Sequence, residues 1–311
     1  MIVIFGAGGI GGFIAGALVR SGVETGVVAR GAHLEAIRER GLRIESSLGN
    51  FEARVNAAND LREFDAPEYV LLTFKSHQWH GVLAQFEKAV KSGTTFVTLQ
   101  NGLPFWYTRD RTLESVDPGG RIRATIPYGQ IIGGVVHTSG TVPKPGLVRQ
   151  TGNMLYPIGE PDGSPSPRVA RLSEILQGAG LHAPVESDIR RLVWRKLLGN
   201  LALNPVSALT GATVREMLHD EPTRAVLRAI IEEGLAVARA AGAEIGVTAE
   251  ERLEMAMHIA DVKTSMQQDL EAGKPLELEP ICGATIELAR QYGVPVPHIE
   301  TVYALTKLRA K

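Results

Sequence analysis

Short apolar runs alternate with amphipathic stretches through the first half of the chain. Four such runs occur, at Ile2–Phe5 and at residues 25–29, 69–74 and 94–99. Nearly continuous apolar runs of this length are typical of parallel strands that are buried on both faces. Helical spacing separates them at residues 10–20 and again at residues 79–90. This order predicts βαβ units in an α/β domain of the Rossmann type, with a doubly wound parallel sheet.

The pattern changes between residues 129 and 159. Short strand-like pieces are separated there by Gly and Pro, which predicts antiparallel strands added to the edge of the sheet. A turn-rich segment, residues 159–167, leads into a predicted helix at residues 168–179.

Strand signals stop after about Ser187. Helical spacing continues at residues 192–203, 224–241, 248–271, 281–292 and 298–308. Thr248 and Glu251 fit a capping box at the start of the third of these helices. We therefore predict a dinucleotide-binding Rossmann-type domain at residues 1–187, followed by an all-helical C-terminal domain at residues 188–311.

Composition excludes several classes of protein. The chain has 311 residues, with 33 Lys and Arg against 34 Asp and Glu, so a general nucleic-acid binder is disfavoured. One cysteine, Cys282, excludes an internal disulfide and a zinc site with several cysteines. His77 and His80 have no evident third ligand, so we predict no metal. Without a leader or an apolar run of ~18 residues, the chain is predicted to be cytoplasmic, with no membrane partner.

A glycine-rich loop joins the first strand to the first helix. The sequence GAGGIG fits G-x-G-x-x-G, and this context makes the pattern a dinucleotide-binding signature. The first glycine permits a tight turn, the second lets the backbone approach the pyrophosphate, and the third lets helix and strand pack closely. The predicted cofactor-binding residues of the loop are Gly6, Ala7, Gly8, Gly9, Ile10 and Gly11.

The residue after the second strand selects the cofactor. Sites for NAD place Asp or Glu here to bind the ribose 2′-hydroxyl, but this chain has Arg30. A guanidinium can bind a 2′-phosphate in a bidentate manner, so we predict NADPH rather than NADH. The alternative is that Arg30 is only a solvated surface charge.

Polar residues follow two later strands of the predicted sheet. Lys75 comes directly after the strand at residues 69–74, and Asn101 follows the strand at residues 94–99. Ligands bind outside the carboxyl ends of strands in such sheets, so both are candidates for holding the nicotinamide ribose or the substrate. Turn chemistry alone is an equally good explanation of Asn101 with Gly102.

A polar stripe runs along an otherwise apolar helix. Lys196, Asn200 and Asn204 are spaced i, i+4 and i+8, so they share one side of the helix. Leu, Ala and Gly fill most positions between them. Unpaired polar groups in such surroundings are costly, and a polar cleft with a ligand would supply their partners. A solvated face is the alternative, but such faces usually carry Glu, Lys and Arg.

Together these motifs resemble the ketopantoate reductase (2-dehydropantoate 2-reductase) family over nearly the whole chain. The similar segments are GAGGIGG, FKSHQ, LQNG, WRKLLGNLALNPVSALT and SMQQDLEAGKPLELEPICG. The resemblance implies NADPH-dependent reduction of a 2-oxo acid, ketopantoate, to pantoate in pantothenate and coenzyme A biosynthesis. A small-molecule 2-oxo acid is then the expected partner.

The resemblance also implies roles for individual residues. Lys196 would be the catalytic general acid, and Glu277 the second catalytic residue, bonding the substrate hydroxyl. Asn200 and Asn204 would bind substrate, and Ser265 its carboxylate. The residues expected at the junction of nicotinamide and substrate are Asn101 and Lys75.

Three departures from the family pattern concern the substrate. An aromatic stretch, residues 103–107, replaces the usual glycine after Gly102, while Glu279 and Cys282 stand where Asp and Asn are common. The alternatives are a paralogous reductase of another 2-oxo or 3-oxo acid, a 3-hydroxyacid dehydrogenase, and a non-catalytic NADPH-binding sensor. A homodimer through the helical domain is a further possibility.

Overall fold

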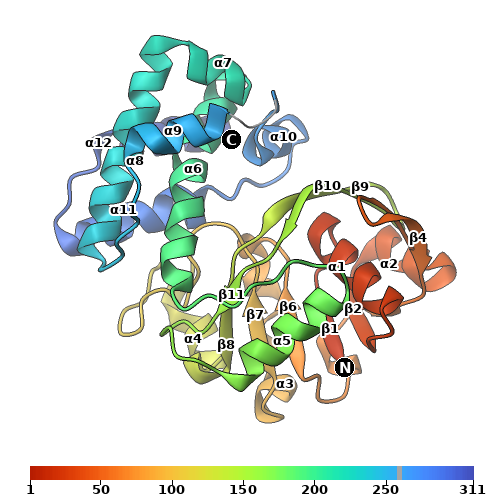
Figure 1. The fold of residues 1–311 in the computed structure, drawn as a ribbon. Helices are drawn as coiled ribbons and strands as arrows, with labels where there is room; N and C mark the ends of the chain where they lie inside the picture. The colour runs from red at the N-terminus through yellow and green to blue at the C-terminus, as the bar shows by residue number, and fades with distance from the viewer. Residues whose placement is uncertain (258–260) are drawn as a thin grey trace. The chain divides into compact units, whose positions relative to one another are not determined.

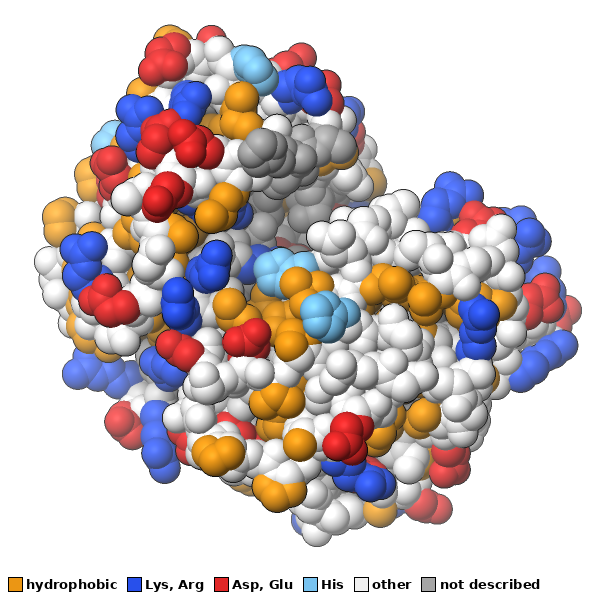
Figure 2. Space-filling view, in the orientation of Figure 1, with side chains coloured by type: hydrophobic (Ala, Val, Ile, Leu, Met, Phe, Trp, Pro, Cys, Tyr) orange, Lys and Arg blue, Asp and Glu red, His pale blue; other side chains and the backbone are white. Residues whose placement is uncertain are grey.

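The computed structural model describes residues 1–257 and 261–311, and the chain forms two compact units (Figure 1). The first unit comprises Met1–Gln100 and Arg121–Ile189, and the second comprises Asn101–Gly120 and Arg190–Lys311. The segment Asn101–Gly120 therefore groups with the C-terminal helices. In the described part of the chain, no helix is long and apolar enough to cross a membrane. Acidic and basic side chains are interspersed on the face drawn in Figure 2.

A seven-stranded sheet forms the centre of the first unit, in the order β11-β8-β7-β6-β1-β2-β5. Its strands are β1 (Ile2–Phe5), β2 (Thr25–Val28), β5 (Asn56–Ala58), β6 (Tyr69–Leu72), β7 (Thr95–Thr98), β8 (Ile131–Gly134) and β11 (Ile158–Gly159). All neighbouring strands are parallel except β11, which pairs with β8 in the antiparallel direction. The predicted parallel α/β sheet is confirmed.

Both faces of this sheet are covered. Ile2 and Ile4 belong to an apolar core that includes residues of α1 (Gly9–Arg20) and α5 (Pro167–Gly178). On the opposite face, the ring of Phe5 lies 5.1 Å from that of Phe74. The remaining helices of the unit are α2 (Gly31–Arg40), α3 (Glu87–Lys91) and α4 (Arg121–Thr125).

The prediction of one continuous helix at residues 79–90 is wrong. Two 3₁₀ turns, Ser76–Gly81 and Leu83–Gln85, precede the short helix α3. A 3₁₀ turn buries positions three apart, so it satisfies nearly the same apolar spacing as an α-helix over so short a run. Gly81 at the junction disfavours a continuous helix.

The prediction for residues 129–159 is wrong in part. In the main sheet only β11 is an antiparallel edge strand, and β8 joins this sheet in parallel. The other two strands of the region, β9 and β10, belong to a second, four-stranded sheet with the order β4-β3-β10-β9. Its strands are β3 (Leu42–Ser46), β4 (Gly49–Ala53), β9 (His137–Lys144) and β10 (Leu147–Leu155).

Glycines on α1 allow the second sheet to pack against this helix. A Cβ atom on Gly9 would overlap the backbone of Gly140 in β9, and Cβ atoms on Gly12 and Gly16 would crowd side chains of the same sheet. Gly9 therefore serves the packing of α1 against β9, a role that the dinucleotide pattern did not indicate.

The second unit is helical, as predicted. Its helices are α6 (Ile189–Thr210), α7 (Val214–His219), α8 (Glu221–Ala240), α9 (Ala249–Met257), α10 (Ser265–Glu271), α11 (Ala284–Tyr292) and α12 (Pro297–Arg309). Helix α8 packs against α7, α9, α11 and α12, and a π-helical turn, Glu279–Gly283, precedes α11. Helix α6 continues through Pro205 beyond its predicted end.

The prediction of one continuous helix at residues 248–271 is wrong. Helix α9 ends at Met257 and α10 begins at Ser265, while residues 258–260 lie outside the described part of the chain. Thr264 begins α10 as its N-cap, because its side chain accepts a hydrogen bond from the Gln267 backbone. The capping box of Thr248 and Glu251 is confirmed by reciprocal hydrogen bonds of 2.7 and 3.2 Å.

The glycine packing of α1 can be tested with two neighbouring substitutions. Gly9→Ala should lower the free energy of unfolding by about 1–3 kcal/mol, because its methyl group would overlap the backbone of Gly140. Gly8→Ala is the matched control, since no neighbouring atom lies within 4 Å of the added carbon. Urea unfolding of both variants measures the difference, and equal stabilities would contradict this role of Gly9.

Candidate active site

Three loops of the first unit follow adjacent parallel strands. The glycine loop follows β1, Arg30 follows β2 and Lys75 follows β6, and β2, β1 and β6 are neighbours in the sheet. Because the carboxyl ends of parallel strands share one edge, the structure places these three elements along the same edge of the first unit. Arg30 is exposed and begins α2, while Lys75 is half-buried.

The glycine loop leaves room for a ligand at one position. Gly6 has a φ of 108°, and a Cβ atom there would lie 2.8 Å from the Phe74 nitrogen. Gly11 packs against the backbone of the same turn. By contrast, no neighbouring atom lies within 4 Å of a Cβ atom on Gly8, which begins α1 without a side-chain cap. An uncapped helix N-terminus with an open approach fits the pyrophosphate of a dinucleotide.

His33 holds the glycine loop from α2. Its Nε2 lies 2.7 Å from the carbonyl oxygen of Ala7, and its Nδ1 accepts a hydrogen bond from Gly146 at 3.0 Å. These partners require a proton on Nε2 only, and burial lowers the pKa of His33 accordingly. Sequence reasoning did not identify this residue, because nothing about a histidine early in a helix indicates such a partner.

A chain of hydrogen bonds in the second unit joins an ammonium group to a carboxylate. Lys196 Nζ donates to Asn101 Oδ1 at 2.6 Å, and Asn101 Nδ2 donates to Glu277 Oε2 at 3.0 Å. All three side chains are half-buried. The structure therefore brings together three residues that are up to 176 positions apart in the sequence.

The surroundings of Lys196 alter its acidity. Burial lowers the pKa of its ammonium group to about 8, while the negative charge of Glu277 acts in the opposite direction. The group is therefore mostly protonated at neutral pH and releases its proton more readily than an exposed lysine. Such a pKa suits a general acid.

Contacts next to Asn101 hold it at this position. Gly102 has a φ of 84°, and a Cβ atom there would overlap the carbonyl group of Pro280 in the π-helical turn. The backbone nitrogen of Leu103 donates to the same carbonyl oxygen at 2.8 Å. Since Pro280 follows Glu277 by three residues, one contact fixes Asn101 relative to this carboxylate.

The aromatic stretch after Gly102 attaches the segment to α6. Trp194 Nε1 donates to the hydroxyl oxygen of Tyr107 at 2.6 Å. Arg190, one helical turn earlier, donates to the Tyr107 carbonyl oxygen and lies over its ring, 4.2 Å from the centroid. Trp194 and Lys196 are two residues apart, so this attachment also aligns Asn101 with Lys196. The aromatic side chains of this stretch, residues 103–107, are therefore buried in the second unit.

The rest of the polar stripe on α6 is available to a ligand. Neither Asn200 nor Asn204 has a side-chain hydrogen-bond partner within residues 1–257 and 261–311. Asn204 as a whole residue is only 6% exposed. Together with Lys196 they form a row of polar groups that fits a small polar molecule.

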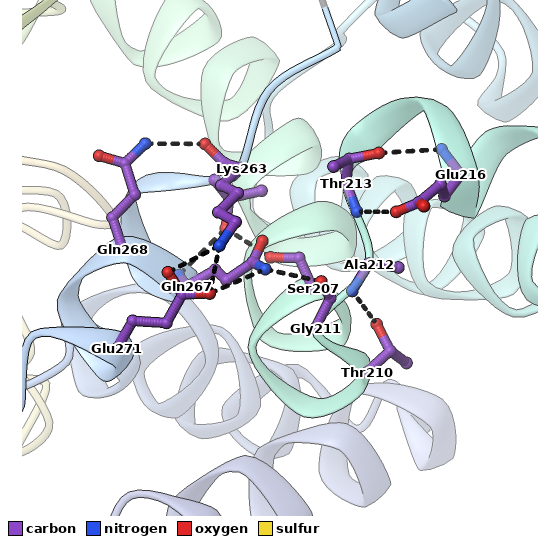
Figure 3. A network of polar contacts seen from close by, with 11 residues as sticks. Ser207, Thr210, Gly211, Ala212, Thr213, Glu216, Lys263, Gln267, Gln268 and Glu271 are labelled. Carbon is purple, nitrogen blue, oxygen red and sulfur yellow. Dashed lines mark hydrogen bonds and ion pairs between the residues drawn. The ribbon is translucent and has the colours of Figure 1, made fainter.

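Ser265 is the first residue of α10, which contacts the C-terminal end of α6. Thr264, its neighbour, hydrogen-bonds Ser207 of α6. Gln267 donates to the carbonyl oxygen of Gly211 at 2.8 Å, and Lys263 pairs with Glu271 (Figure 3). These contacts hold α10 against the end of α6 and leave the Ser265 side chain exposed.

Comparisons with known proteins point to the same family over nearly the whole chain. A family model described as ketopantoate reductase PanE/ApbA matches residues 2–163, and one described as its C terminal matches residues 188–310. A 2-dehydropantoate 2-reductase of Mesorhizobium japonicum is 41% identical over 98% of this chain and 96% of its own length.

Two solved structures are similar over nearly the whole chain. A PanE/ApbA family ketopantoate reductase from Ralstonia eutropha has a TM-score of 0.86 at 28% identity, covering 100% of this chain and 98% of its own. A 2-dehydropantoate 2-reductase from Methylococcus capsulatus has a TM-score of 0.85 at 29% identity, with coverages of 99% and 96%.

Proposed function

We propose, from the premise that the chain belongs to the ketopantoate reductase family and is an oxidoreductase, that it reduces 2-dehydropantoate to pantoate with NADPH. The observation that carries the proposal is the hydrogen-bonded chain of Lys196, Asn101 and Glu277. It offers a half-buried proton donor, linked through an amide to a carboxylate, and reduction of a carbonyl requires a proton donor as well as a hydride.

The chemistry follows from the charges of the reaction. Bound NADPH supplies a hydride to the 2-oxo carbon, and negative charge then develops on the carbonyl oxygen. The ammonium group of Lys196 uses one hydrogen bond on Asn101 and keeps two more donors for that oxygen. It stabilises the developing charge and donates the proton, which is worth roughly 10²–10⁴-fold in rate.

The neighbours of Lys196 complete the catalytic group. Asn101 orients the ammonium group through its amide oxygen, and Glu277 favours the protonated form before the reaction. Once the proton has left, the same carboxylate promotes its return from solvent. Glu277 also accepts the hydrogen bond of the substrate hydroxyl group, while Asn200, Asn204 and Ser265 bind the rest of the substrate.

The first unit holds the cofactor in this proposal. The backbone at Gly8 and the start of α1 receive the pyrophosphate, and Lys75 contacts the nicotinamide side. Arg30 binds the ribose 2′-phosphate, because its exposed guanidinium follows β2 and no acidic residue takes this position.

NADPH oxidation with purified protein and ketopantoate tests the activity. We expect rapid turnover by the wild type and a loss of about 10²–10⁴-fold in Lys196→Ala with unchanged NADPH affinity, because only proton donation is removed. Lys91→Ala, an exposed lysine of α3, is the control.

Different outcomes of this assay separate the alternatives. Faster turnover of another 2-oxo acid would retain the mechanism and reassign the substrate. Tight NADPH binding without turnover of any 2-oxo acid would favour the sensor. Near-native turnover by Lys196→Ala would remove this residue from the mechanism.

Cofactor selection depends on Arg30. We expect Arg30→Ala to lower the preference for NADPH over NADH by about tenfold or more, because a charge-assisted contact to the 2′-phosphate is lost. Kinetics with both cofactors measure this ratio, and Arg40→Ala at the other end of α2 is the control. An unchanged ratio would show that another residue selects the cofactor.

A further inference from the structure

Arg252 of α9 lies directly on α6. A Cβ atom on Gly199 would be 2.8 Å from the Cζ atom of Arg252 and closer still to its Nη2, so only a glycine leaves room for this guanidinium. The side chain is half-buried. The sequence does not single out Arg252, because glutamates flank it and the pattern is typical of a solvent-exposed helix face.

No carboxylate neutralises this guanidinium among the described residues. Arg252 has no ion pair and no side-chain hydrogen bond there, and the same is true of Arg195, its charged neighbour on α6. Burial and the positive charge of Arg195 both lower the pKa of Arg252. The nearest acids on α9 have other partners: Glu250 binds Arg224 and Arg228, and Glu251 caps its own helix.

An unpaired guanidinium in a partly desolvated position is costly unless it has a functional partner. Two arginines whose positive charges repel each other, without an acid that neutralises them among the described residues, attract an anion. The planar fork of Arg252 matches the two oxygens of a carboxylate. The arrangement therefore selects for a carboxylate ligand that the chain itself does not provide.

The position of Arg252 relative to Lys196 suits a 2-oxo acid. Gly199 follows Lys196 by three residues, which is about 4.5 Å along the helix axis. The carboxylate of a 2-oxo acid is bonded directly to the carbonyl carbon, so its binding group must lie near the proton donor.

We propose that Arg252, seated on Gly199 beside Arg195, binds the carboxylate of the 2-oxo acid substrate one helical turn from Lys196. This inference rests on the proposed function and adds a second carboxylate-binding residue to Ser265, the one that the family resemblance implies. It also restricts the substrate class: the carbonyl group next to Lys196 must carry an anionic neighbour, so simple aldehydes and ketones are poor substrates.

Two variants test the site in different ways. Arg252→Gln removes the charge, and Gly199→Ala keeps every charge but displaces the guanidinium, which is the flexible end of a long side chain. Arg252→Lys keeps a charge without the fork. Arg215→Gln, which removes an exposed arginine of α7, is the matched control.

Calorimetry of the NADPH-loaded protein with oxamate, an unreactive carboxylate analogue of a 2-oxo acid, gives a readout independent of turnover. We expect both Arg252→Gln and Gly199→Ala to weaken oxamate binding and to raise KM for ketopantoate by about 10- to 100-fold. The oxamate affinity of Arg252→Lys should lie between that of these two variants and that of the wild type. NADPH affinity and the Arg215→Gln control should not change.

The outcomes separate this inference from the proposed function. Wild-type oxamate affinity in both variants would overturn the carboxylate site, as would a loss of NADPH affinity, which would assign Arg252 to the cofactor. Absence of oxamate and pantoate binding to the wild type would also overturn it. If Arg252→Gln weakens oxamate binding but the wild type does not reduce ketopantoate, the carboxylate site stands and the proposed substrate fails.

Discussion

The proposed chemistry of this protein depends on one side-chain amide. Asn101 accepts a hydrogen bond from the Lys196 ammonium group and donates one to the Glu277 carboxylate. A half-buried ammonium needs such partners, because an unpaired charge away from water is costly. Burial lowers the pKa of the Lys196 ammonium group to about 8, and the negative charge of Glu277 acts in the opposite direction. In the proposed mechanism the amide orients an ammonium group that is charged at neutral pH and still able to donate its proton.

Much of the second unit serves to hold that amide. The Gly102 turn contacts Pro280, and the Tyr107 side chain is bound to α6 by Trp194 two residues before Lys196. The segment Asn101–Gly120 therefore groups with the helices although it follows a strand of the first unit. The groups proposed to carry out the proton chemistry are thereby fixed within a single unit. The loops proposed to bind the cofactor follow the strand ends of the other unit.

Features that depend on local spacing were predictable from the sequence, and those that depend on distant contacts were not. Apolar runs identified four of the six parallel strands, β1, β2, β6 and β7, and the i, i+4 spacing identified the stripe of Lys196 and Asn200. The amide bridge required the contact of Gly102 with Pro280, which no local pattern encodes. The second sheet was missed because its two local strand pairs, β3 with β4 and β9 with β10, are joined by pairing of residues about 100 positions apart. Arg252 was missed because only Gly199, on another helix, distinguishes it from a solvated arginine.

The most direct test of Lys196 as the proton donor is the pH dependence of single-turnover hydride transfer from NADPH to ketopantoate. A general acid must be protonated to act, so the rate should be constant below neutral pH and fall as the pH rises through about 8, the pKa of the Lys196 ammonium group. A rate that stays constant up to about pH 10, where an ordinary lysine titrates, would contradict this role of Lys196.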